Sequence, residues 1–179
     1  MQRFKNFDEI DQTTPILIAG QTASGKSHLA LKIAKECGGI IINADAIQVY
    51  KNWTILTARP SSQDEADIKH KLYGHVDGTT VYSVGRWIKE IKELLSNSAR
   101  PIIVGGTGLY FSALTNGLVD IPAIPEATRF EANSRIKKNG VESLVPEIDQ
   151  ETVQKIDTNN PVRVQRAWEV LRSTGRGLD

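Results

Sequence analysis

Cysteine is almost absent from this sequence. Cys37 is the only one among 179 residues, so a disulfide-stapled fold is excluded. This usage is typical of proteins of a reducing compartment, and we expect a cytoplasmic protein. Cys37 ends an apolar helical pattern, which favours a packing role over a chemical one.

Long hydrophobic runs are also missing. No apolar stretch approaches the roughly 20 residues that a helix needs to cross a bilayer, so we expect no membrane partner. Residues 1–14 are polar and charged, unlike a secretory signal, and we expect a frayed lead-in there. The histidines His28, His70 and His75 show no metal-ligand spacing, and we assign them no ligand role.

The sequence also lacks an excess of positive or negative residues. Lys and Arg number 22 and Asp and Glu 21, for a formal net charge of +1. This balance argues against nonspecific coating of nucleic acid, although it leaves room for a local basic site. With 40% hydrophobic residues, the length fits one compact soluble domain, which we expect to be a monomer.

What the sequence does contain is a complete phosphate-binding loop. Gly20, Gln21, Thr22, Ala23, Ser24, Gly25, Lys26 and Ser27 match the pattern G-x-x-x-x-G-K-[ST]. The run 15–19 before the loop is a predicted strand, and residues 26–37 after it have helical spacing, ended by glycines.

The chemistry of this loop follows from its residue types. The two glycines permit backbone angles that turn N–H groups toward phosphate oxygens, at the positive end of a helix. Lys26 brings a mobile charge to the outer phosphates, and Ser27 is placed to bind Mg²⁺. The motif predicts a phosphorylated ligand without identifying it.

A second segment of interest follows the apolar run 40–42, which predicts a buried parallel strand. Asp45 comes directly after it, at the sheet edge where ligands bind. The spacing leaves open a catalytic base, a carboxylate of the magnesium shell and a simple helix cap. Gln48 is three residues on, and its carboxamide suits an adenine edge.

The third segment is Gly105-Gly106-Thr107-Gly108, at the end of a buried strand predicted over residues 101–104. It indicates either close backbone approach to a ligand or a tight strand-to-helix turn. Residues 51–73 are predicted to be irregular, either as a surface loop or as a mobile cover over the ligand-binding crevice. Ser83 is predicted to cap a covering helix with Trp87 in the core.

These elements predict an α/β fold, with a parallel sheet flanked by helices as in P-loop NTPases. From residue 125 the chain is helical, and Asn160-Pro161 predicts the start of its last helix. Arg163 and Arg166 are three residues apart on that helix. They are either part of a solvated helix face or contacts to phosphate groups.

In combination the motifs resemble the tRNA dimethylallyltransferases, also called isopentenyl-tRNA transferases. The resemblance rests on the phosphate loop, on Asp45 to Tyr50, on Gly105 to Tyr110, and on Arg163 to Val170 with the Thr-Gly-Arg that follows. It implies transfer of a dimethylallyl group from dimethylallyl diphosphate to N6 of the adenosine beside the anticodon of tRNA, position 37, with Mg²⁺ as cofactor.

The resemblance also implies roles for single residues. The phosphate loop would hold the leaving diphosphate, joined by Arg129, and Asp45 would orient the amine and accept its proton. Thr107 would touch the tRNA, as would Ala46, Ile47 and Gln48 beside the base. Arg163 and Arg166 would contact the anticodon stem-loop.

The same comparison implies a division of the chain. Residues 1–122 would form the α/β core, residues 123–160 a helical insertion that contacts tRNA, and residues 161–179 a helix that returns to the core.

The sequence departs from the family at Gln21, where proline is usual, at Ala46, where serine is usual, and at Leu56, where glycine is common. Family members also continue beyond the final Thr-Gly-Arg, which would fit a complementing C-terminal fragment. A truncated diphosphate- or RNA-binding remnant and a small-molecule P-loop kinase are the alternative hypotheses.

Overall fold

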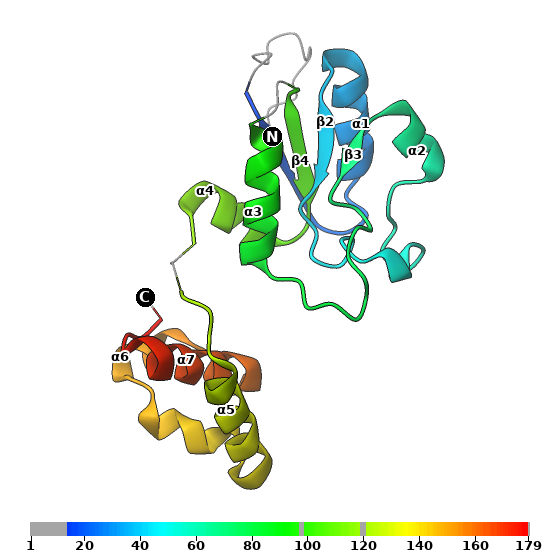
Figure 1. Cartoon of the computed structure of the whole chain (residues 1–179). Helices are drawn as coiled ribbons and strands as arrows, with labels where there is room; N and C mark the ends of the chain where they lie inside the picture. Colours follow the sequence, from blue (N-terminus) through cyan, green and yellow to red (C-terminus); the bar gives the residue numbers. More distant parts are fainter. Residues whose placement is uncertain (1–13, 97–98, 119–120, 179) are drawn as a thin grey trace. The chain divides into compact units, whose positions relative to one another are not determined.

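The computed structural model describes residues 14–96, 99–118 and 121–178 (Figure 1). The expected lead-in over residues 1–14 lies almost wholly outside them. The chain divides into two compact units, residues 1–118 and 119–179. The division falls a few residues before the expected boundary at residue 122. No helix in the described part is long and apolar enough to span a bilayer.

The first unit is built on a four-stranded sheet. Its strands are β1 (Ile16–Ala19), β2 (Ile40–Asn43), β3 (His70–Lys71) and β4 (Pro101–Gly105). They lie in the order β1-β4-β2-β3, and every neighbouring pair is parallel. The carboxyl ends of the strands therefore share one edge, which confirms the predicted α/β class and places the three motifs together.

Helices cover both faces of this sheet. They are α1 (Lys26–Cys37), α2 (Ser62–Asp67), α3 (Val84–Leu95) and α4 (Gly108–Asn116), with a 3-10 turn, η2 (Lys51–Trp53). Alternate strand residues point to opposite faces. Ile41 and Ile102 pack with α1, whereas Ile42 and Ile103 pack with Trp87 of α3. Trp87 is fully buried, as predicted.

The segment 51–73 is more ordered than its sequence predicts. It contains η2, α2 and the short edge strand β3. A capping box begins α2, because the Ser61 hydroxyl accepts from Asp64 N and the Asp64 carboxylate accepts from Ser61 N. The strand has only two residues and no apolar run, so alternation could not reveal it.

The second unit is wholly helical. It contains α5 (Glu126–Asn139), η3 (Val141–Glu147), α6 (Gln150–Lys155) and α7 (Pro161–Thr174). Asn160 caps α7 by accepting from Val162 N and Arg163 N, as its sequence predicts. Trp168 and Leu144 are buried in a core that α7 forms with α5 and η3. Within the second unit α7 packs against α5 and η3, and the return of residues 161–179 to the α/β core stays a prediction.

Candidate active site

The phosphate loop joins β1 to α1 and has the backbone that its sequence requires. Gly25 has φ 83°, a left-handed angle that a side chain would strain, and Ala23 adopts φ 62° despite its side chain. Lys26 Nζ donates to Gln21 O at 3.0 Å, so the ammonium lies across the loop. The loop therefore presents its amides and one cation at the start of α1.

The ends of three strands meet beside this loop. Gly20 N donates to Gly105 O at 3.3 Å, which joins β1 to β4. A Cβ on Gly105 would collide with the Ala44 main chain, so the close approach of β4 to the end of β2 requires glycine. Thr107 N donates to Ala44 O at 3.3 Å, and Thr107 Oγ1 accepts from Ala46 N at 2.9 Å. Thr107 thus fixes the segment that carries Asp45.

Asp45 lies against the phosphate loop. A Cβ built on Gly106 would lie 3.3 Å from Gly20 O and 3.6 Å from Asp45 Oδ2, so one small residue separates the carboxylate from the loop. Asp45 Oδ1 accepts from Ile47 N at 2.9 Å and Gln48 N at 3.4 Å. This carboxylate and residues 22–27 line one pocket of about 380 Å³. The predicted pairing of the acid with the loop is present.

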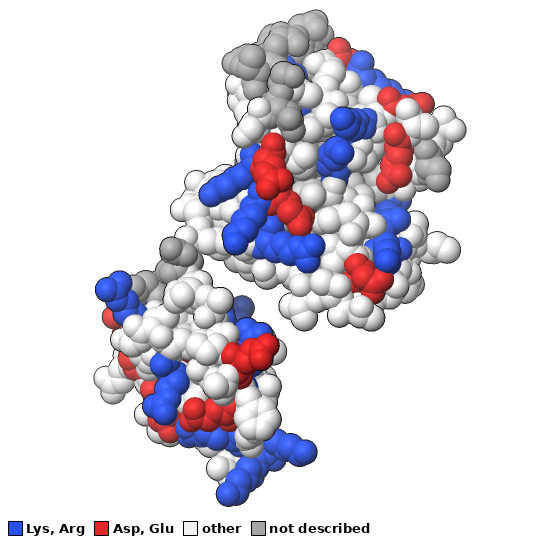
Figure 2. Space-filling view, viewed as in Figure 1, with Lys and Arg blue, Asp and Glu red and all other residues white. Residues whose placement is uncertain are grey.

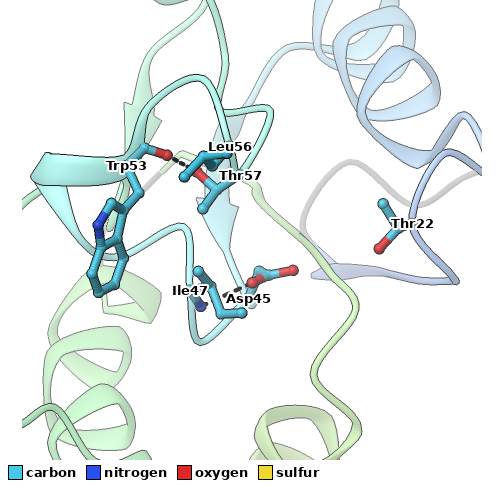
Figure 3. A pocket seen from close by; sticks show the side chains of 6 residues that line it. All are labelled: Thr22, Asp45, Ile47, Trp53, Leu56 and Thr57. Carbon is cyan, nitrogen blue, oxygen red and sulfur yellow. Dashed lines mark hydrogen bonds between the residues drawn. The ribbon is translucent and has the colours of Figure 1, made fainter.

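A second pocket, of about 360 Å³, adjoins the first and is more apolar (Figure 3). Asp45, Thr22 and Thr57 belong to both pockets. The additional walls are large apolar side chains that remain accessible to solvent: Ile47, Trp53 and Leu56. Sequence reasoning gave Trp53 no role, because a single tryptophan in a polar segment carries no periodic signal.

Gln48 has a structural partner that the sequence did not reveal. Its Nε2 donates to Thr57 O at 2.7 Å and to Ala58 O at 3.3 Å. The donor side of the carboxamide therefore holds the 57–58 turn against the end of β2. Bidentate pairing with adenine would need that donor, so only the Gln48 oxygen is available for it in this conformation.

The donor set suits a hard divalent cation that is held partly by the protein and partly by a phosphorylated ligand. Ser27 and Asp45 line the same pocket and offer hydroxyl and carboxylate oxygens. Among the described residues, no group of three His, Cys, Asp or Glu side chains gathers as a metal site. Mg²⁺ commonly uses one or two protein ligands and completes its shell with phosphates and water. The residues present fit that arrangement.

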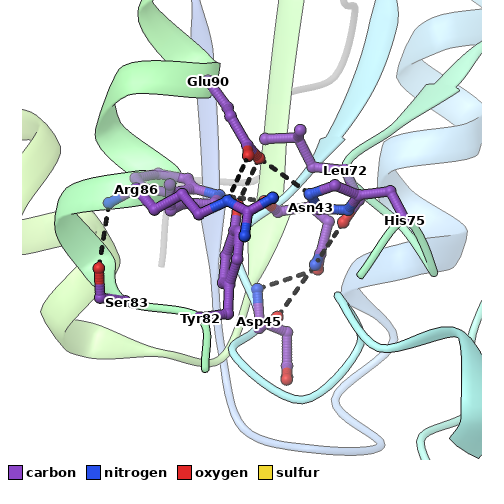
Figure 4. Close-up of polar contacts among 9 residues, drawn as sticks. Asn43, Asp45, Leu72, His75, Tyr82, Ser83, Arg86 and Glu90 are labelled. Atoms are coloured by element: carbon purple, nitrogen blue, oxygen red, sulfur yellow. Dashed lines mark hydrogen bonds and ion pairs between the residues drawn. The ribbon is translucent and has the colours of Figure 1, made fainter. Parts of the chain in front are cut away.

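A polar cluster supports this edge of the sheet from α3 (Figure 4). Glu90 Oε2 lies 2.6 Å from Tyr82 OH and 2.8 Å from His75 Nε2, and Glu90 Oε1 lies 3.0 Å from Arg86 Nε. Partial burial acts to raise the pKa of Glu90, but these hydrogen bonds outweigh it and lower that pKa. Burial, and then the bond to Glu90, raise the pKa of Tyr82. The cluster ties residues 75–83 to α3.

Three predicted arginines belong to the second unit. Arg129 lies on α5, and Arg163 and Arg166 lie on α7; Arg129 and Arg163 are exposed and Arg166 is partly buried. Figure 2 shows both signs of charge interspersed on the visible face. Because these arginines lie in the other unit, their contribution to the site stays a prediction.

Two family profiles and several curated proteins match this chain. A family profile described as IPP transferase matches residues 48–179, and one described as isopentenyl transferase matches residues 14–75. A tRNA dimethylallyltransferase of Cereibacter sphaeroides strain KD131 is 55% identical over 170 residues, 95% of this chain and 54% of the relative. The tRNA dimethylallyltransferase of Ruegeria sp. strain TM1040 is 54% identical over 173 residues, which are 97% of this chain and 59% of the relative.

Solved structures give the same result. A eukaryotic dimethylallyltransferase described as acting on tRNA has a TM-score of 0.76 at 31% identity, over 92% of this chain and 42% of that chain. The full-length tRNA isopentenylpyrophosphate transferase of Bacillus halodurans has a TM-score of 0.58 at 31% identity, over 91% of this chain and 56% of that chain.

This chain spans about half the length of the curated relatives that it matches. The match nonetheless includes the phosphate loop, Asp45, the glycine turn at residue 106 and the α7 helix, and it extends over nearly the whole chain. The chain belongs to the IPP transferase family.

Proposed function

We propose that this chain carries the catalytic core of a tRNA dimethylallyltransferase. The substrates are dimethylallyl diphosphate and a tRNA with adenosine next to its anticodon. The exocyclic amine of the adenine attacks the first carbon of the allylic group. A carbon–nitrogen bond forms, the carbon–oxygen bond to diphosphate breaks, and the diphosphate leaves with the electron pair.

One observation carries this proposal. The Asp45 carboxylate and the phosphate loop line a single pocket, with only Gly106 between Asp45 and Gly20. A transfer to an amine needs a group that accepts the amine proton and a group that stabilises the leaving anion, within reach of the same reacting carbon. The pocket supplies both.

Each residue of the pocket has a task in this scheme. The loop amides and Lys26 hold the diphosphate and stabilise the charge that develops on its bridging oxygen. Asp45 Oδ1 is occupied by the backbone N–H groups of Ile47 and Gln48, so Oδ2 is the oxygen that faces the amine and accepts its proton. The adjoining pocket offers an apolar surface against which the dimethylallyl group can pack.

Ser27 is the loop residue that would hold Mg²⁺, with Asp45 at the outer shell. When bound, this ion neutralises negative charge on the diphosphate. The nucleotide that reacts has to leave its stack to reach a pocket of this kind. Arg129, Arg163 and Arg166 are proposed to contact the tRNA, with Arg129 also near the diphosphate.

The test compares three reactions of the purified chain. One contains unmodified tRNA and labelled dimethylallyl diphosphate, one contains the diphosphate without tRNA, and one contains ATP with small-molecule acceptors. We expect label in the tRNA, recovered as a prenylated adenosine after nuclease digestion.

Two results would contradict this proposal. Binding of diphosphate and tRNA without transfer would show that residues 1–179 act as a binding fragment. Consumption of ATP with transfer to a small acceptor would assign the chain to the P-loop kinases. Addition of the C-terminal part of a curated relative separates an incomplete enzyme from an inactive one.

A further inference from the structure

Asn43 is a buried polar residue to which the proposed mechanism gives no task. It is the last residue of β2, its accessible surface is 0%, and it is among the largest fully buried side chains of the described chain. A buried carboxamide is costly unless its donors and acceptor are all satisfied. Its partners therefore indicate what it is there to hold.

Those partners are the two backbone groups of Asp45. Asn43 Oδ1 accepts from Asp45 N at 2.9 Å, and Asn43 Nδ2 donates to Asp45 O at 2.9 Å (Figure 4). One planar side chain thus fixes both ends of the residue that carries the carboxylate. Asp45 lies past the end of β2, outside the strand pairing, so these side-chain bonds orient it in place of the sheet.

The same carboxamide joins this site to the edge of the sheet. Its second Nδ2 hydrogen donates to Leu72 O at 3.0 Å. Leu72 has φ 60°, a conformation that is strained for a leucine and that needs support from its surroundings. The main chain of Asn43 is itself held, because Trp87 Nε1 donates to Asn43 O at 2.8 Å.

We propose that Asn43 is a positioning residue that sets the direction of the Asp45 carboxylate toward the phosphate loop. The kinetic consequence of this inference rests on the proposed function. Its structural part stands alone: without this carboxamide, the peptide groups of Asp45 lose two of the bonds that fix the backbone from which the carboxylate extends toward Gly106.

The kinetic test uses Asn43→Ala, with Trp87→Phe as the matched control. The control removes the indole N–H bond to Asn43 O and some core volume, but does not change the Asn43 carboxamide itself. A misplaced catalytic group can cost about 10²-fold in rate, so we expect Asn43→Ala to lower kcat by about that factor. We expect the KM for dimethylallyl diphosphate to change by less than about 3-fold, because the phosphate loop is untouched.

Asn43→Asp is the second variant, and it keeps the shape of the side chain. It replaces the donor that faces Asp45 O and Leu72 O by an oxygen, so we expect a loss of kcat at least as large as that of Asn43→Ala. Equal loss of kcat in Trp87→Phe and Asn43→Ala, at matched melting temperatures, would overturn the inference. So would an unchanged kcat in folded Asn43→Ala.

A measurement without substrate separates this inference from the proposed function. In the wild-type chain the Asp45 amide donates to Asn43 Oδ1, whereas the Ala46 amide donates to Thr107 Oγ1. We expect Asn43→Ala to speed hydrogen exchange at Asp45 by at least about 10-fold while Ala46 changes far less. Equal acceleration at both amides, or none at Asp45, would overturn the inference even if the chain transfers no prenyl group. If neither variant folds, the same exchange is measured in Asn43→Ser, which keeps one hydroxyl at the site.

Discussion

At the scale of single residues, the site depends on a few side chains that are oriented by backbone bonds. Asp45 receives two N–H bonds on one oxygen, and Thr107 holds the next peptide group. Lys26 is the one lysine or arginine among the described residues that line the phosphate pocket, which also contains His28. The site therefore has one carboxylate, Asp45, and one ammonium, Lys26, and single substitutions test each of them.

Lys26→Ala is expected to weaken diphosphate binding by about 10- to 100-fold. The reason is that a hydrogen bond to a charged group contributes about 1.5–3 kcal/mol. Calorimetric titration with inorganic diphosphate measures the change. Lys32→Ala is the matched control, because it removes the same charge from the exposed side of the same helix. Equal affinities for wild type and Lys26→Ala would contradict the role given to the loop.

At the scale of elements, the site is the carboxyl edge of a parallel sheet, and its apolar wall comes from the segment after β2. Trp53 is 41% exposed, whereas Trp87 and Trp168 are at most 1% exposed. Of the three tryptophans of the chain, Trp53 therefore reports on the solvent-exposed pocket wall and the other two report on buried surroundings.

We expect acrylamide to quench mainly the fluorescence of Trp53. In Trp53→Phe the quenchable fraction should fall by more than half, while the far-ultraviolet circular dichroism stays unchanged. The substitution lies in a 3-10 turn at the surface, so little stability depends on it. An unchanged quenchable fraction would show that the segment is closed over the pocket in solution.

Much of the first unit could be predicted from sequence. The loop, its helix and the parallel strands at residues 16–19, 40–43 and 101–105 have strong local patterns, and the structure confirms them. The strand β3 could not be predicted, because two polar residues at an edge have no pattern.

The site was predicted only in part. Its acid and loop follow from motifs, but the parts played by Asn43 and Gln48 do not. Each depends on hydrogen bonds to residues that are distant in sequence, such as Leu72 and Thr57. Local patterns in a single sequence do not reveal which residues the fold will bring together.

The second unit has an ion pair that we expect to make its stability depend on pH. Arg135 donates to Glu147 at 2.7 and 3.0 Å, and Trp168 Nε1 donates at 2.8 Å. The bonds from Arg135, and then the bond from Trp168, lower the pKa of Glu147 to about 2. A lowered pKa in the folded state stabilises the fold above the ordinary pKa of glutamate, and this contribution is lost as the pH falls.

We therefore expect the melting temperature of the wild-type chain to fall between about pH 4.5 and pH 2. Glu147→Gln should melt at a lower temperature near pH 7 and should show a smaller decrease over that interval. Glu151→Gln is the control, since its pair with Lys155 is exposed. If Glu147→Gln and wild type have parallel pH profiles, the ion pair does not contribute to stability.

At the scale of the whole molecule, the proposed function needs the helical unit to bind tRNA. Arg163→Ala should weaken tRNA binding and reduce its salt slope by about one, as expected for the loss of one phosphate contact. Arg172→Ala is the control: it lies nine residues on, on the opposite side of the same helix, near Glu131 and Trp168. Affinity measured by filter binding at several salt concentrations distinguishes them, and identical slopes for all three proteins would leave Arg163 as a solvated side chain.

The central claim is that the Asp45 carboxylate beside the phosphate loop accepts the proton of the attacking amine. The most direct measurement is the single-turnover rate of prenyl transfer to tRNA by Asp45→Asn, which keeps the oxygen that accepts from Ile47 N. We predict a rate about 10²- to 10⁴-fold below wild type, with diphosphate affinity and melting temperature nearly unchanged. A rate within about 3-fold of wild type would contradict the account, because it would show that the reaction proceeds without this base.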